Sequence, residues 1–92
     1  MNKKSYIYIL SNIKNSVIYI GMTANLEKRI YAHKQKTNQG FTFKYNVTKL
    51  VYFEKFPDIY QAINREKQIK KWSRKAKDRL IQTMNPTWKD LF

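Results

Sequence analysis

The sequence contains no cysteine and only two glycines and two prolines among its 92 residues. The absence of cysteine excludes disulfides, thiolate zinc sites and cysteine nucleophiles. The scarcity of glycine and proline excludes a flexible linker and a collagen-like fibre. A chain of this length fits one domain over residues 1–92. A small domain without disulfides or zinc ligands is typical of a reducing compartment, so we expect a cytoplasmic protein.

Long hydrophobic runs are also missing. The apolar run at residues 6–10 follows two lysines, but it is shorter than the ~7–15 residues of a signal-peptide core. No stretch approaches the ~18 apolar residues that read as a membrane-spanning helix. We therefore expect neither a signal peptide nor a membrane-embedded segment.

Acidic residues are scarce as well. Six Asp and Glu stand against 19 Lys and Arg, which gives a formal net charge of +13. This excess favours a polyanionic partner, such as DNA, RNA or an anionic membrane face. The simpler alternative is a basic protein that its lysines keep soluble. Aromatic residues make up 15% of the chain, which argues against disorder and for a small core.

The hydrophobic pattern predicts a small antiparallel sheet. β-Branched and aromatic residues fill 6–10 and 17–20, and the polar segment 11–16 between them predicts a hairpin. Residues 50–56 predict a third strand. Alternation places Ile7, Ile9, Ile18 and Ile20 on one kind of face, and Tyr6, Tyr8, Val17 and Tyr19 on the other.

Three helices are expected around these strands. They run over about residues 26–35, from Asp58 to about residue 72, and over about 74–83. Gly21 is expected to end the second strand, and residues 36–47 are expected to form a loop. The candidate helix caps are Thr23 or Asn25, Asp58 with Gln61, and Ser73. The order β-β-α-β-α-α predicts an α+β fold with the helices flanking the sheet.

One carboxylate stands out on the second expected helix. Glu66 lies within the apolar stripe that Ile59, Ala62, Ile63 and Ile69 form on a helical wheel. An acid in that position is costly unless something pairs with it. One explanation is an internal salt bridge, and the other is a metal ligand or general base at the edge of a cleft. Solvent or helix capping is expected to explain the other five acids.

Arg29 and His33 are one helical turn apart, so their side chains are neighbours on one face. Such a pair is often only a surface feature, but arginine can bind a phosphate and histidine can accept a proton near neutral pH. One histidine without cysteine or clustered acids cannot build a zinc site. Tyr8 and Tyr19 lie on paired strands and matching faces, so their hydroxyls could share a site, although such pairs usually only stabilise a sheet.

The densest basic segment is residues 64–79, with eight Lys and Arg against Glu66 and Asp78. A solvated helix face is one interpretation, and phosphate contacts are the other. The aromatic segment 41–45, with its single lysine, suits stacking on unpaired bases. The candidate nucleic-acid-binding residues are Lys44, Arg65, Lys67, Lys70, Lys71, Arg74 and Lys75.

The order of these features along the chain resembles the GIY-YIG endonuclease superfamily, above all its small stand-alone bacterial members. The resemblance covers residues 6–91 and departs from the family in one position, because the first motif begins with Tyr6 and not with glycine. The residues that carry it are Tyr6-Ile7-Tyr8, Tyr19-Ile20-Gly21, Arg29 with His33, Glu66 and Asn85. The family implies a three-stranded antiparallel sheet flanked by helices, and divalent-metal-dependent hydrolysis of phosphodiester bonds. Our leading hypothesis is that the substrate is DNA.

The resemblance also implies a role for each residue. The catalytic set is Tyr8, Tyr19, Arg29, His33 and Glu66. Glu66 would be the single ligand of Mg²⁺ or Mn²⁺, and Asn85 would be the family's late asparagine, which we group with the nucleic-acid-binding residues. Water would lose a proton to a tyrosine hydroxyl, with Tyr8 as the first choice, and His33 would take that proton onward. A tyrosine pKa near 10 must be lowered by nearby cations for this role.

Two other functions stay open at this point. The chain could be a nucleic-acid-binding module that keeps the nuclease fold without turnover, because 92 residues leave no room for the separate domain that aims such catalytic units. A separate targeting protein could instead direct a catalytically active chain to its substrate. A basic RNA-associated structural protein would explain the charge but not the placement of Glu66, Arg29 and His33.

Overall fold

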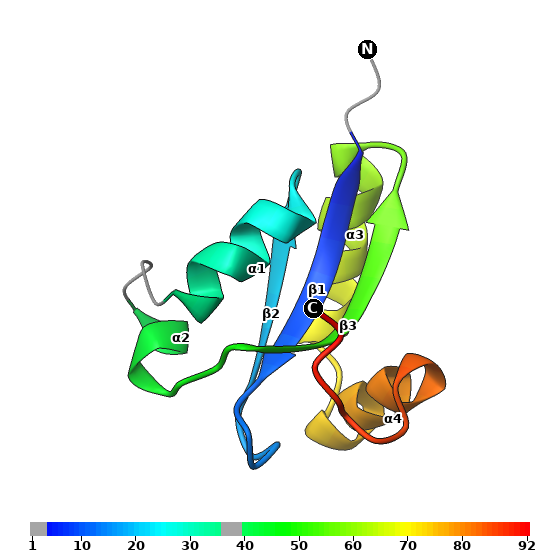
Figure 1. Ribbon diagram of the computed structural model, residues 1–92. Helices are drawn as coiled ribbons and strands as arrows, with labels where there is room; N and C mark the ends of the chain where they lie inside the picture. Colours follow the sequence, from blue (N-terminus) through cyan, green and yellow to red (C-terminus); the bar gives the residue numbers. More distant parts are fainter. Residues whose placement is uncertain (1–3, 36–39) are drawn as a thin grey trace.

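The computed structural model describes residues 4–35 and 40–92 (Figure 1). Its elements are, in chain order, β1 (Ser5–Ser11), β2 (Ile18–Thr23), α1 (Leu26–Lys34), α2 (Phe41–Lys44), β3 (Lys49–Phe56), α3 (Ile59–Lys70) and α4 (Arg74–Met84). The predicted α+β fold with a three-stranded antiparallel sheet is confirmed. The short helix α2 was not expected: it lies in the predicted loop 36–47, of which residues 36–39 are outside the described residues.

β1 is the central strand, because its side chains are apolar or aromatic on both faces and are buried on both. The strand order is β2-β1-β3, with both neighbours antiparallel to β1. Tyr8 of β1 lies opposite Gly21 of β2, and Leu10 lies opposite Tyr19. β2 and β3 are therefore the outer strands, and Tyr8 and Tyr19 are diagonal neighbours on one face.

The two faces of the sheet pack against different helices. Figure 1 shows α1 and α2 on one side of the sheet and α3 on the other. One core cluster joins Ile7, Ile9, Ile20 and Val51 of the sheet to Ala62, Ile69 and Ile81 of α3 and α4. The other joins Tyr8, Leu10 and Leu50 to Ile30 of α1 and Val47. This division confirms the alternation predicted along the first two strands.

Gly21 does not end β2, which continues to Thr23. A Cβ atom on Gly21 would lie 2.5 Å from Cζ of Tyr8 and 3.0 Å from Cε2 of Tyr19. Real Cβ atoms do not approach other atoms as closely as the first distance. Glycine is therefore required here by the close approach of the Tyr8 ring, and not by a strand end.

The predicted helix caps are present. Asn25 accepts from the Lys28 N–H (3.1 Å), Asp58 from the Gln61 N–H (2.9 Å) and Ser73 from the Ala76 N–H (3.1 Å). These side chains satisfy backbone donors that have no partner inside the first helical turn. None of the helices in the described ranges is both long and apolar enough to cross a membrane.

Candidate active site

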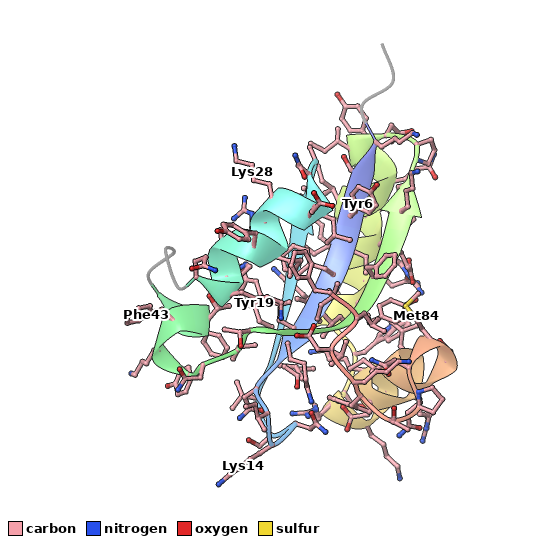
Figure 2. The ribbon with its side chains drawn as sticks, viewed as in Figure 1. Tyr6, Lys14, Tyr19, Lys28, Phe43 and Met84 are labelled. Atoms are coloured by element: carbon pink, nitrogen blue, oxygen red, sulfur yellow. The ribbon has the colours of Figure 1, made fainter. Side chains whose placement is uncertain are left out.

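Tyr8, Tyr19 and His33 form a cluster of three rings from β1, β2 and α1. The ring centroids are 6.3 Å apart for the two tyrosines, 5.9 Å for Tyr8 and His33, and 6.1 Å for Tyr19 and His33. Tyr8 is 1% exposed and His33 is 6% exposed. Tyr19 is half-buried (labelled in Figure 2). Three of the five predicted catalytic residues therefore meet at one place.

A chain of polar contacts leads from Tyr8 through His33 to α2. The Tyr8 hydroxyl lies 3.3 Å from Nε2 of His33. Nδ1 of His33 lies 3.1 Å from Oγ1 of Thr42, a buried residue of α2. Both ring nitrogens of His33 thus have a partner. Thr42 was missed in the sequence, because no local pattern brings α2 to the end of α1.

The surroundings move the pKa values of Tyr8 and His33 in opposite directions. Burial raises the pKa of Tyr8 far above its usual value near 10, and the neighbouring Tyr19 and Glu66 act in the same direction, while Arg29 opposes them. Burial and then the charge of Arg29 lower the pKa of His33 below 6.5. Near neutral pH, Tyr8 therefore holds its proton and His33 is uncharged. At Tyr8 this shift is opposite to the lowered pKa that we expected for a catalytic tyrosine.

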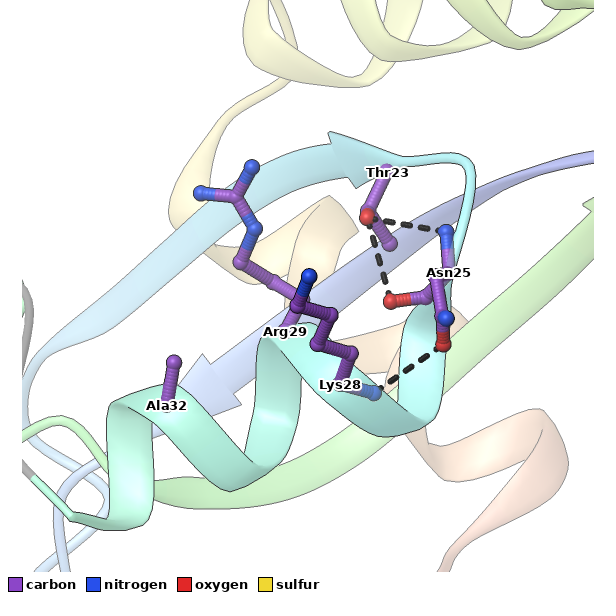
Figure 3. A pocket seen from close by; sticks show the side chains of 5 residues that line it. All are labelled: Thr23, Asn25, Lys28, Arg29 and Ala32. Carbon is purple, nitrogen blue, oxygen red and sulfur yellow. Dashed lines mark hydrogen bonds between the residues drawn. The ribbon is translucent and has the colours of Figure 1, made fainter.

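Arg29 lies on the exposed face of α1, one turn before His33. It lines a groove of about 320 Å³, which we call the α1 groove (Figure 3). The residues that line the α1 groove are Thr23, Asn25, Lys28, Arg29 and Ala32. The positive charge of Arg29 acts on both Tyr8 and His33. Its guanidinium therefore influences the ring cluster electrostatically. Because Arg29 is exposed, the same group is accessible to an anionic ligand.

Glu66 lies on α3 with 20% of its side chain exposed, and it contributes to the raised pKa of Tyr8. Its carboxylate lies 3.4 Å from Nζ of Lys70, whose side chain is 54% exposed. The ion pair that we considered for Glu66 is thus present, but its partner is a solvated lysine one turn along the same helix. Exposed pairs of this kind are weak, so Glu66 keeps the capacity to bind another cation.

The donor set fits a metal held mainly by water and substrate. In the described residues, no group of three or more His, Cys, Asp and Glu could hold a metal ion. Mg²⁺ usually keeps several waters and is bound through one or two carboxylates together with phosphate oxygens. Glu66 meets that requirement as a single carboxylate whose charge acts on Tyr8.

Two other acids are not explained by solvent or capping, so that expectation was wrong for them. Glu54 accepts from Nε of Arg65 at 3.0 Å and from the Tyr52 hydroxyl, and only 20% of its side chain is exposed. Asp90 binds the Lys34 ammonium and accepts from the Leu50 N–H at 3.2 Å. Both join separate parts of the fold, a role that needs tertiary contacts to recognise.

The predicted basic residues divide into two groups. Arg65 binds Glu54 and Oε1 of Gln68 (2.7 Å), and Arg74 binds Asp78 (2.7 Å) and the Ser16 carbonyl (2.9 Å). These two guanidinium groups are therefore used within the fold. The candidates that stay exposed are Lys44, Lys67, Lys70, Lys71 and Lys75.

Asn85, predicted to bind nucleic acid, is buried and bonded within the fold. It is 1% exposed, and its amide donates to the carbonyls of Val51 (3.1 Å) and Lys89 (2.7 Å). Its Oδ1 accepts from the Lys89 N–H at 3.1 Å. Both amide hydrogens are used, so Asn85 ties the segment after α4 to β3.

A second groove lies along the other half of β2. It has a volume of about 320 Å³, and we call it the α2 groove. The residues that line the α2 groove are Ile18, Tyr19, Ile20, Phe41, Lys70 and Lys77. The Phe41 ring stacks on Tyr19 (6.1 Å between centroids, 29° between planes) and is 47% exposed. Lys28 and Lys77, which line the two grooves, were not among the predicted binding residues.

The sequence of residues 4–81 matches the protein-family model of the GIY-YIG catalytic domain. This range includes the ring cluster, Arg29 and Glu66. The chain belongs to the GIY-YIG family. It is 43% identical over 79 residues to a UPF0213 protein of Clostridium perfringens, covering 86% of this chain and 84% of that one. It is 38% identical over 84 residues to a UPF0213 protein of Syntrophus aciditrophicus, covering 90% and 94%.

A solved structure of a relative has the same architecture. The solution NMR structure of the UPF0213 protein from Bacillus halodurans matches with a TM-score of 0.60 at 26% identity, over 95% of this chain and 92% of that one. The resemblance inferred from the motifs is therefore confirmed over most of the chain.

The two GIY-YIG motifs meet through the register of β1 and β2. Tyr8, the last residue of the first motif, lies opposite Gly21, the last residue of the second. The residue that replaces the first glycine, Tyr6, is half-buried near the start of β1, opposite Thr23 (Figure 2). This substitution lies two residues along β1 from the contact between Tyr8 and Gly21, which it leaves intact.

Proposed function

We propose that this protein is a metal-dependent endonuclease that hydrolyses phosphodiester bonds in DNA. The observation that carries the proposal is the meeting of the Tyr8, Tyr19 and His33 rings, with the charges of Arg29 and Glu66 both acting on Tyr8. A net charge of +13 supports a polyanionic substrate. Membership of a family named for its catalytic domain supports the same reaction class.

Glu66 would hold Mg²⁺ or Mn²⁺, which when bound supplies Lewis-acid stabilisation of a phosphate oxygen and of the leaving group. Arg29 would bind the scissile phosphate from the α1 groove. Its planar guanidinium offers several fixed donors to the charge that grows on the phosphate oxygens in the transition state. Tyr19 would orient the phosphate or the attacking water from the opposite strand.

Tyr8 and His33 would form the proton path. Because its pKa is raised, the Tyr8 hydroxyl stays protonated in the free protein. Tyr8 therefore acts as a proton relay. Its oxygen accepts a proton from the attacking water while its own proton passes to Nε2 of His33, 3.3 Å away. The water oxygen forms the new bond to phosphorus as the bond to the leaving oxygen breaks. The lowered pKa of His33 keeps Nε2 free to receive the proton near neutral pH.

A plasmid-nicking assay tests the proposal. We expect the wild-type protein to nick supercoiled DNA with Mg²⁺ or Mn²⁺ and to stop when EDTA is added. Glu66→Gln and Arg29→Ala should each lower the rate by about 10²-fold or more. Lys55→Ala, an exposed position on the opposite outer strand β3, is the matched control and should nick normally.

The same assay can reject the proposal. Wild-type protein that nicks no faster than Glu66→Gln would exclude the nuclease and leave the nucleic-acid-binding module without turnover. A rate that falls equally in Lys55→Ala would assign the nicking to a contaminant or to general charge.

A further inference from the structure

We infer that a nucleic-acid strand crosses the molecule along the outer edge of β2, from the α1 groove to the α2 groove. The inference deepens the proposed function and rests on it, since it concerns how the substrate reaches the same site. It assigns phosphate and base contacts to Lys28, Lys77 and Phe41.

The two grooves lie along one edge of the sheet. β2 pairs only with β1 among the described residues, so its other edge has no strand partner there. Thr23, the last residue of β2, lines the α1 groove, and residues 18–20 line the α2 groove. A nucleic-acid strand that occupies both grooves must therefore run along β2.

The catalytic candidates are distributed between the two grooves. Arg29 lines the α1 groove and Tyr19 lines the α2 groove. The Tyr19 ring is within 6.3 Å of the Tyr8 ring, centroid to centroid. A phosphate held between the grooves would therefore lie beside the proposed proton path, with further nucleotides on both sides.

The charges along this edge suit a phosphate backbone. Lys28 and Arg29 line one groove and Lys70 and Lys77 the other. Among the described residues, no acidic side chain lines either groove. Elsewhere on the basic helices, Arg65 and Arg74 already bind Glu54 and Asp78. Of the four cations that line the grooves, Lys70 also pairs with Glu66, an exposed and therefore weak pair. The edge of β2 thus offers cations to a phosphate, whereas Arg65 and Arg74 are already used within the fold.

The two grooves differ in chemistry, which gives the strand distinct contacts at each end. Thr23, Asn25 and two cations make the α1 groove polar and suited to phosphate (Figure 3). Ile18, Ile20 and Phe41 make the α2 groove apolar, with lysines beside them. The exposed Phe41 ring contacts Tyr19 and also Tyr45, whose ring centroid is 4.8 Å away. An exposed aromatic ring of this kind suits contact with a base.

Binding measured without metal separates this inference from catalysis. The affinity of a fluorescent DNA oligonucleotide would be followed by anisotropy in EDTA over a series of KCl concentrations. The double variant Lys28→Ala/Lys77→Ala should flatten the slope of log Kd against log salt by about 2 if both residues touch phosphate. Lys55→Ala/Lys89→Ala removes two exposed lysines away from both grooves and should leave the slope unchanged.

Phe41 provides an uncharged readout. Phe41→Ala should weaken binding by about 10-fold with the salt slope unchanged, because it removes a base contact and no charge. Phe43 is equally exposed, at 47%, but does not line the α2 groove, so Phe43→Ala should weaken binding less. Thermal unfolding of each variant would verify that the fold is retained.

The outcomes are distinct for the path and for the reaction. Equal flattening of the slope in both lysine pairs, or no loss of affinity in Phe41→Ala, would overturn the path along β2. The nuclease would survive either result if the wild-type protein nicks DNA and Glu66→Gln abolishes the nicking. A protein that fails to nick but loses binding only in the groove variants would retain the path and lose the nuclease.

Discussion

Gly21 lies directly opposite Tyr8 in the β1–β2 pair, and the missing side chain of the glycine makes room for the tyrosine ring. The glycine thus makes room for the ring whose buried hydroxyl takes part in the proposed proton path. This is a packing requirement, because the atoms that a Cβ at position 21 would meet belong to the side chains of Tyr8 and Tyr19.

Gly21→Ala should destabilise the fold by about 1–3 kcal/mol, because the new methyl overlaps the Tyr8 ring and forces it aside. Chemical denaturation followed by circular dichroism measures this change. In a Tyr8→Ala background, where the ring is gone, the added cost of Gly21→Ala should largely disappear. An equal cost in both backgrounds would mean that the strand backbone, and not the ring, requires glycine.

Thr42→Val should alter the proposed proton path while it preserves the shape of the side chain. The substitution removes the partner of His33 Nδ1, 3.1 Å away, so the imidazole loses the contact that holds this nitrogen. We expect slower nicking and a displaced pH profile, and a stability loss of about 1–3 kcal/mol from the unpaired buried nitrogen. Thr42→Ser keeps the hydroxyl and should restore the profile. A Val variant with normal pH dependence would leave Thr42 a packing residue only.

His33 should titrate below 6.5, the direction in which burial and Arg29 move its pKa. Because the unfolded state then binds the proton more readily, stability due to this group is intact above pH 6.5 and falls as the pH drops below it. His33 is the only histidine of the chain, so its ring proton signals can be followed by NMR without ambiguity. Nicking should fall in the same range, as Nε2 becomes protonated. A pKa at or above 6.5 would contradict the buried, neutral imidazole.

How far these features could be read from the sequence depends on the range of the interactions. Local patterns were sufficient for the three strands, three of the helices, their caps and the shared face of Tyr8 and Tyr19. The helix α2, its contact with His33 and the reason for Gly21 depend on how separate elements pack. No pattern within one segment encodes them.

The basic residues show the same division. Composition predicts a polyanionic partner, but it does not show which basic side chains already form ion pairs or hydrogen bonds within the fold. Arg65 and Arg74 were counted with the lysines, yet their partners Glu54 and Ser16 lie 11 and 58 residues away in the sequence. Arg74 also pairs with Asp78, which lies one helical turn away. Lys77 was one of eight basic residues in its segment, and only the α2 groove distinguishes it.

Arg65→Ala should lower stability and leave the salt dependence of DNA binding unchanged. The guanidinium binds Glu54, and its ring-stacking partner Trp72 is 5.3 Å from it. Since the pair is about a quarter exposed on the arginine side, we expect a coupling of about 1 kcal/mol in a double-mutant cycle with Glu54→Ala. A flattened salt slope in Arg65→Ala would instead show that Arg65 contacts the nucleic acid.

Asn85→Ala should destabilise the protein without weakening DNA binding by the remaining folded protein. The buried amide donates to Val51 and Lys89 and accepts from Lys89, so its removal leaves a strand carbonyl and two groups of the C-terminal segment without partners. A cost of about 1–3 kcal/mol is expected for a buried group left unpaired. Asn85→Asp keeps the size and the acceptor but loses both donors, and should cost at least as much.

Denaturation measures the loss of stability in the Asn85 variants, and the KCl series below the unfolding midpoint measures their DNA binding. A normal stability with a flattened salt slope would instead place Asn85 against the nucleic acid.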